Sequence, residues 1–168
     1  MKRARGFSLI ELLIVIAIIL IIAALAIPNL LRARIAANEA SAANSIRKIA
    51  TAEVAYAAAF PTQGYANALS NLGGPATGCN PTSATACILD SILSGGVKSG
   101  YQFVAIGINQ GGPTNSAFVA GSAPTSFNMT GVRNFCAITD GVLRSLSQAG
   151  GAAPANNQAT CLAYPISQ

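Results

Sequence analysis

The chain has 168 residues, of which 52% are hydrophobic and 9% are charged, and its formal net charge is +5. The charged fraction is well below the roughly 25% of ordinary soluble proteins. The sequence has no histidine, which excludes a Ser/His/Asp triad and removes the commonest metal ligand. Only Asp90 and Asp140 are acidic after Glu53, too few for a catalytic carboxylate pair or a calcium site. We therefore expect a protein that is not an enzyme and holds no metal or cofactor.

Residues 1–6 form a short basic leader that contains Lys2, Arg3 and Arg5 and ends at Gly6. Positive charges that precede an apolar run remain on the cytoplasmic side of a membrane. Removal of this leader would lower the formal charge from +5 to +2. The basic character of the chain is therefore attributed in large part to a targeting segment and not to a surface for nucleic acid.

An apolar run follows the leader, and residues 12–31 carry no charge. With residues 7–10 in front, this stretch reaches the length of about 20 residues that a bilayer core requires. It includes one carboxylate, Glu11, which at the centre of a membrane helix costs roughly 2.5–3.5 kcal/mol. No residue near Glu11 on the same helix is positive, so we expect its partner to come from another copy of the chain. A cleaved secretory signal peptide and a plain signal anchor are the alternatives, and neither accounts for Glu11.

The residues at this junction, Gly6-Phe7-Ser8-Leu9-Ile10-Glu11, resemble the class III signal of type IV pilins and of the pseudopilins of type II secretion. Pro28 also stands where that family commonly has a proline. The resemblance implies that a prepilin peptidase, which is also a methyltransferase, cleaves between Gly6 and Phe7 and methylates the new amine of Phe7. It further implies that Glu11 of an incoming subunit meets the Phe7 amine of a neighbour in a filament. A neutral Glu11 held by a backbone carbonyl is the alternative.

The apolar run continues into a helix that changes character at Pro28, where the missing amide predicts a kink near residues 24–28. The family often has a glycine eight residues before this proline, and here that position is Leu20. Residues 33–60 are alanine-rich and lack glycine and proline, which favours continuous helix as far as Pro61. Apolar residues recur along one face of this helix and predict packing on a sheet: Ile35, Ala42, Ile46, Ile49, Tyr56 and Phe60. Most polar residues are expected on the other faces, namely Glu39, Asn44, Arg47, Lys48 and Glu53.

The rest of the chain is predicted to form a small globular head. Residues 61–100 are rich in Gly, Pro, Asn, Ser and Thr and predict a loop region with helical turns near residues 67–72 and 86–93. Strands are predicted over residues 101–108, 116–120, 133–139 and 142–145, with Pro124 bounding the second and Asp140-Gly141 forming a tight hairpin turn. We expect an antiparallel sheet of three or four strands within residues 101–147, followed by a low-complexity tail over residues 148–168. Lys98, Arg133 and Arg144 are interpreted as ordinary solvated surface.

The four cysteines all follow the apolar helix, on the side expected to face an oxidising compartment, and their even number favours two disulfides. Three connectivities are possible. We favour Cys79–Cys87 and Cys136–Cys161 because each closes a local loop, and the second would pin the tail to the sheet. Free buried thiols are the alternative, and the lack of Cys-x-x-Cys spacing argues against zinc.

The predicted fold is therefore α+β, a pilin-like lollipop in which a long N-terminal helix packs on a small antiparallel sheet with disulfide-bounded loops. Its expected parts are a cleaved leader (1–6), a membrane or filament-core helix (7–31), an amphipathic half of the helix (32–60) and a globular head (61–168).

The resemblance implies a structural subunit of a type IV pilus, stored in the bacterial inner membrane and polymerised into a surface filament for adhesion, motility or DNA uptake. The implied partners are copies of itself, the prepilin peptidase, membrane lipid, and an inner-membrane assembly platform with a separate ATPase. No specific nucleic acid or small molecule is expected. The alternatives are a pseudopilin of a periplasmic pseudopilus and a membrane-anchored binding module that does not polymerise; the absence of an acidic calcium loop favours the pilin.

Overall fold

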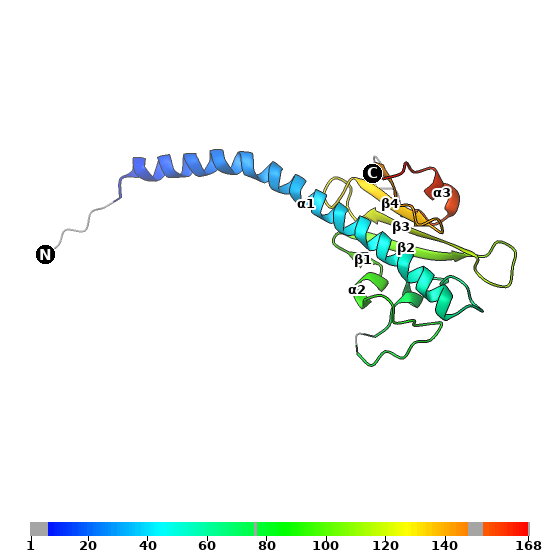
Figure 1. The fold of residues 1–168 in the computed structure, drawn as a ribbon. Coiled ribbons are helices and arrows are strands. Elements are labelled where there is room, and N and C mark those ends of the chain that lie inside the picture. Colours follow the sequence, from blue (N-terminus) through cyan, green and yellow to red (C-terminus); the bar gives the residue numbers. More distant parts are fainter. Residues whose placement is uncertain (1–6, 76, 148–152, 168) are drawn as a thin grey trace. The chain divides into compact units, whose positions relative to one another are not determined.

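The computed structural model describes residues 7–75, 77–147 and 153–167. The chain divides into two compact units, Met1–Arg34 and Ile35–Gln168. Each unit is described by itself. The long helix α1, Leu9–Ala59, contributes its first part to the first unit and its remainder to the second (Figure 1).

In the first unit, α1 begins at Leu9 and remains helical through Pro28. A proline inside a helix removes one backbone hydrogen bond, here the one to the carbonyl of Ala24. The helix is nevertheless continuous on both sides of Pro28. The kink expected near residues 24–28 stays a prediction.

In the second unit, the remainder of α1 ends at Ala59, next to Pro61, as the sequence predicts. Ala42, Ile46, Ile49 and Tyr56 of the predicted apolar face are buried, and Ile35 and Phe60 are half-buried.

Two of the polar residues were wrongly placed on the outer faces of this helix, because Glu39 and Glu53 are both buried. Each carboxylate accepts backbone N–H groups from the head, Glu39 from Val132 and Arg133 and Glu53 from Ala66. Those donors lie outside the helix, so helical periodicity alone carries no sign of them.

The head contains a five-stranded antiparallel sheet in which neighbours in sequence are neighbours in space. Its strands are β1 (Val97–Lys98), β2 (Tyr101–Ile108), β3 (Ala117–Pro124), β4 (Arg133–Ile138) and β5 (Arg144–Ser147). The extra strand relative to prediction is β1, whose two residues pair with Tyr101 and Gln102. In addition, β3 extends four residues beyond the predicted end, and its last residue, Pro124, pairs with Tyr101.

Both faces of the sheet are covered, which explains why every residue of β3 is buried. On one face, residues of α1 such as Ile46 and Ile49 pack with Phe103, Phe118 and Phe135. On the other face, a smaller cluster joins the sheet to the tail: Val119, Cys136, Ile138, Ala155, Cys161 and Tyr164. Figure 1 shows α1 and the tail helix α3 (Gln158–Leu162) flanking the strands.

The tail therefore carries structure that its low complexity did not predict, although residues 148–152 and 168 lie outside the described part. Helix α3 begins at the N-cap residue Asn157, whose side chain accepts the N–H of Thr160 at 2.8 Å. The tail passes so close to β3 that a Cβ at Gly121 would lie 2.1 Å from the carbonyl oxygen of Ala155. Only glycine fits at that crossing.

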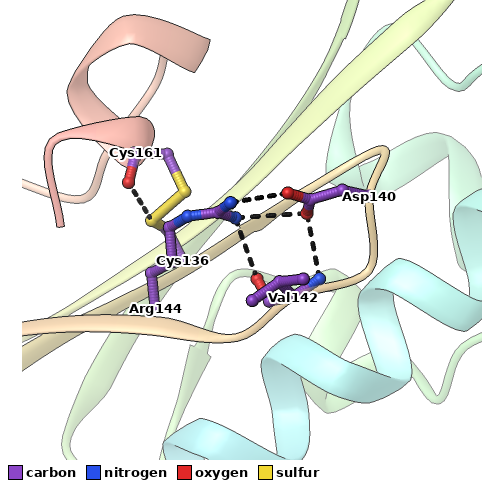
Figure 2. A network of polar contacts seen from close by, with 5 residues as sticks. All are labelled: Cys136, Asp140, Val142, Arg144 and Cys161. Atoms are coloured by element: carbon purple, nitrogen blue, oxygen red, sulfur yellow. Dashed lines mark hydrogen bonds and ion pairs between the residues drawn. A yellow bond between two sulfur atoms is a disulfide. The ribbon is translucent and has the colours of Figure 1, made fainter. Parts of the chain in front are cut away.

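The hairpin between β4 and β5 differs from the tight two-residue turn that Asp140-Gly141 predicted. The turn is wider, because β5 begins at Arg144 and not at Val142, and Arg144 pairs with Cys136. Figure 2 shows the cause: Asp140 accepts the N–H of Val142 and two N–H groups of the Arg144 guanidinium. The hydrogen bonds from Arg144 are also the main reason that the pKa of Asp140 is lowered.

Both disulfides have the favoured connectivity, Cys79–Cys87 and Cys136–Cys161. The first closes a loop after the short 3-10 helix η1 (Leu69–Leu72), which confirms the helical turn predicted near residues 67–72. The predicted turn at 86–93 is displaced to α2 (Ser91–Ser94), because Asp90 is its N-cap and accepts the N–H of Leu93 at 2.9 Å.

Candidate functional site

The N-terminus of α1 brings Phe7 and Glu11 to the start of the helix. Phe7 precedes the first helical residue, Leu9, and its side chain is 80% exposed. Glu11 lies in the first turn, and its Oε2 accepts the backbone N–H of Ser8 at 2.9 Å. This contact satisfies one of the N–H groups that every helix leaves without a partner at its N-terminus. The carboxylate also lies at the positive end of the helix dipole.

The sequence analysis expected Glu11 to pair with another copy of the chain or, as a neutral carboxyl, with a backbone carbonyl, and it missed this contact with the N–H of Ser8. The signal was present, because Ser8 and Glu11 have the Ser-x-x-Glu spacing of a capping box. Among the described residues, Oε1 of Glu11 makes no hydrogen bond, whereas Oε2 is engaged. Glu11 can therefore hold its own helix end and still accept a further donor.

The side chains that follow Glu11 form a continuous apolar surface. Large hydrophobic residues from Leu12 to Leu31 are about half exposed or more. By length and composition, α1 can cross a membrane, and none of the residues in its most apolar stretch is buried in the chain itself. Burying one Leu or Ile side chain contributes about 1.5–3 kcal/mol. A surface of this size is therefore stable only when lipid or other protein covers it.

The head does not gather its cations into one patch. Of Lys98, Arg133 and Arg144, the two arginines form ion pairs with Glu39 at 2.8 Å and with Asp140. Each of the five Asp and Glu side chains accepts at least one backbone N–H: Glu11 from Ser8, Glu39 from Val132, Glu53 from Ala66, Asp90 from Leu93 and Asp140 from Val142. The acids of this chain are thus bound to its own backbone.

Residues 1–27 match the family model described as the prokaryotic N-terminal methylation motif. The chain is also 69% identical over 39 residues to the type IV wide pilus major component PilA4 of Thermus thermophilus, a match that covers 23% of this chain and 30% of that protein. It is 43% identical over 54 residues to the type IV major pilin protein PilA of Myxococcus xanthus, which covers 32% of this chain and 24% of that protein. Over its N-terminal segment, the chain is similar to type IV pilins.

The matches to the two relatives span less than a third of the length of each relative, and no solved structure matches the chain. The similarity to known proteins is confined to the segment that carries Phe7 and Glu11, and the head is described from its own structure. That structure has the α+β architecture expected of a pilin, with a long helix, an antiparallel sheet and two disulfides.

The predicted site residues of the chain fall into two groups. Phe7, Glu11 and Pro28 lie on or next to the first part of α1, and Gly6 lies outside the described residues. The cysteines lie in the head, with Cys136 and Cys161 buried and Cys79 and Cys87 in the loop after η1. The roles of Gly6, Phe7, Glu11 and Pro28 stay predictions.

Proposed function

We propose that this chain is a structural subunit of a type IV pilus, held in the inner membrane as a precursor and then polymerised through α1 into a surface filament. The observation that carries the proposal is the bare apolar surface of residues 12–31 beside the Glu11 carboxylate, of which only Oε2 is hydrogen-bonded among the described residues. Lipid covers this surface before assembly, and the helices of other copies cover it afterwards. Adhesion, motility or DNA uptake would follow from the filament.

In the proposed filament, Glu11 accepts the amine of Phe7 from a neighbouring subunit. An unpaired charge inside a dry bundle of helices costs several kcal/mol, and pairing it with an ammonium removes much of that cost. The exposed position of Phe7 ahead of the helix keeps its backbone nitrogen accessible once the leader is removed. Glu11 thereby selects the register of the helices as well as strengthening their contact.

Processing between Gly6 and Phe7 creates that amine and provides a direct test. A bulky residue in the variant Gly6→Trp should block the prepilin peptidase, because the cleavage site accepts only a small side chain before Phe7, while Gly6→Ala should retain processing. Mass spectrometry of the membrane fraction then shows the intact leader in Gly6→Trp and a methylated Phe7 terminus in the native chain. A normal mature terminus in Gly6→Trp would refute the cleavage site.

Fractionation and imaging distinguish the pilus from its alternatives. Sheared surface fractions are examined by electron microscopy, with labelled antibody against the head, in cells with and without the gene. Long labelled filaments that vanish on deletion support the pilus subunit. Retention in the periplasm together with a secretion defect would indicate a pseudopilin, and a monomer confined to the membrane would indicate an anchored binding module. Assembly on an inner-membrane platform with a separate ATPase belongs to the same proposal.

A further inference from the structure

The head buries two glutamates of α1 that differ in one respect. Glu39 accepts the N–H groups of Val132 and Arg133 and also forms an ion pair with the Arg133 guanidinium. Glu53 is completely buried, and its Oε2 accepts the N–H of Ala66 at 2.8 Å. Its Oε1 has no hydrogen-bond partner within the described residues.

Among the described residues, no ion pair compensates Glu53. The two ion pairs among the described residues belong to Glu39 and Asp140, and the strands β2 and β3 contain no charged residue. Tyr56 lies one turn further along α1, and its pKa is raised by burial and, to a lesser extent, by the charge of Glu53. The hydroxyl of Tyr56 donates to the carbonyl of Ser83 at 2.6 Å. Tyr65, on the facing segment, packs its ring on Phe118. A single hydrogen bond does not offset the burial of an ionised carboxylate.

The segment that Glu53 holds is fastened independently on its other side. Asn115 donates its backbone N–H to the carbonyl of Gln63, accepts the N–H of Tyr65, and donates from Nδ2 to the carbonyl of Tyr65. Gly64 permits this close approach, because it has φ +74° and a Cβ there would lie 2.1 Å from the carbonyl oxygen of Asn115. Loss of the Glu53 contact therefore loosens the chain at Ala66 without releasing the whole segment.

We propose that Glu53 is a protonation-dependent clasp, which holds the Ala66 segment closed on α1 when the carboxyl is neutral and lets it open to water when the carboxylate is ionised. The opening supplies the donors that Oε1 lacks in the closed state. The proposal concerns the head alone, so it does not depend on the filament.

The direction of the pH dependence follows from the environment of the carboxyl. Burial is the main cause that raises the pKa of Glu53 from 4.5 to about 7, and the hydrogen bond from Ala66 opposes it. A raised pKa means that the closed head binds a proton which the open form has released. The clasp is therefore fully closed below the ordinary pKa of 4.5 and weakens as the pH rises through about 7.

Amide hydrogen exchange of the full chain in detergent micelles tests the proposal. The protection factor of the Ala66 amide, corrected for the intrinsic exchange rate, should fall about tenfold or more between about pH 5.5 and about pH 8.5. The Val132 amide is the control within the same molecule, because its glutamate is neutralised by Arg133, and its protection should stay constant. In Glu53→Gln, which cannot ionise, the protection of Ala66 should no longer depend on pH.

Two results would overturn the proposal: constant protection of Ala66 in the native chain, or an undiminished fall in Glu53→Gln. If that variant does not fold, the ¹³C shift of the Glu53 carboxyl in the native chain decides the matter. Titration of that carboxyl in step with the loss of Ala66 protection supports the clasp, and titration at the ordinary pKa of a glutamate contradicts it.

Discussion

Cells that produce Glu11→Ala in place of the native chain are expected to process and store the precursor normally but to yield at least tenfold fewer filaments. The reason is that the amine of each Phe7 would enter the filament core without its counter-charge. Removing one partner of a buried ion pair typically costs about 3–5 kcal/mol, and about 1.4 kcal/mol already corresponds to a factor of ten. The yield of sheared filaments, normalised to pilin in the membrane, measures the effect.

Glu11→Gln is the matched control for this prediction. Its amide oxygen can still accept the N–H of Ser8, which Glu11 holds at 2.9 Å, but it has no charge. If the pairing with Phe7 governs assembly, Gln and Ala at position 11 reduce the filament yield alike. A normal yield in Glu11→Gln with a low yield in Glu11→Ala would assign the role of Glu11 to capping its own helix. A normal yield in both variants would remove Glu11 from assembly altogether.

Replacement of Cys136 and Cys161 by alanine is expected to lower the free energy of unfolding of the head by about 3.5 kcal/mol. The bond joins residues 25 positions apart, and the estimate follows from the entropy of closing a loop of that length in the unfolded chain. Both cysteines are fully buried in the cluster that attaches the tail to the sheet. We therefore expect the tail to detach first. Urea unfolding of the full chain in detergent, followed by circular dichroism, measures the loss.

The Cys79–Cys87 disulfide provides the comparison for this loss of stability. Cys79 and Cys87 are only 8 positions apart, so the double alanine variant at these positions should cost about 2.5 kcal/mol by the same reasoning. Neither cysteine of this loop belongs to a core cluster of the head, and amide exchange in β3 and β4 should remain slow in that variant. A larger loss from the Cys79–Cys87 pair than from the Cys136–Cys161 pair would contradict the role assigned to the tail.

Elements whose signals are local were predicted well from the sequence. The alanine-rich stretch and Pro61 correctly predicted the end of α1. The β-branched and aromatic residues correctly predicted β2 and the start of β4. The last residues of β3 were missed, because Gly-Ser-Ala-Pro has the composition of a turn. These small residues form a strand because they pair with β2 from Tyr101 to Val104, and Gly121 also lies against Ala155 of the tail. No local pattern in the sequence records these contacts.

The same distinction holds for the polar residues of the chain. The motif around Phe7 and Glu11 was readable because its residues are contiguous, and even the unrecognised contact from Ser8 had a known spacing. Glu39 and Glu53 were predicted to be exposed because they are charged residues on an amphipathic helix, whose charged face usually lies toward solvent. Their burial depends on amides that lie 13 and more than 90 residues away.

All five Asp and Glu side chains accept backbone amides. Acidic residues of this chain should therefore tolerate substitution less well than its exposed basic residues. Loss of any acid loosens a particular junction of the main chain. Loss of an exposed cation such as Lys48 loosens none, because Lys48 takes part in neither ion pair of the described residues. The isoelectric point of the protein can therefore drift downward among related sequences at little cost in stability, whereas an upward drift through the loss of acids would weaken the fold.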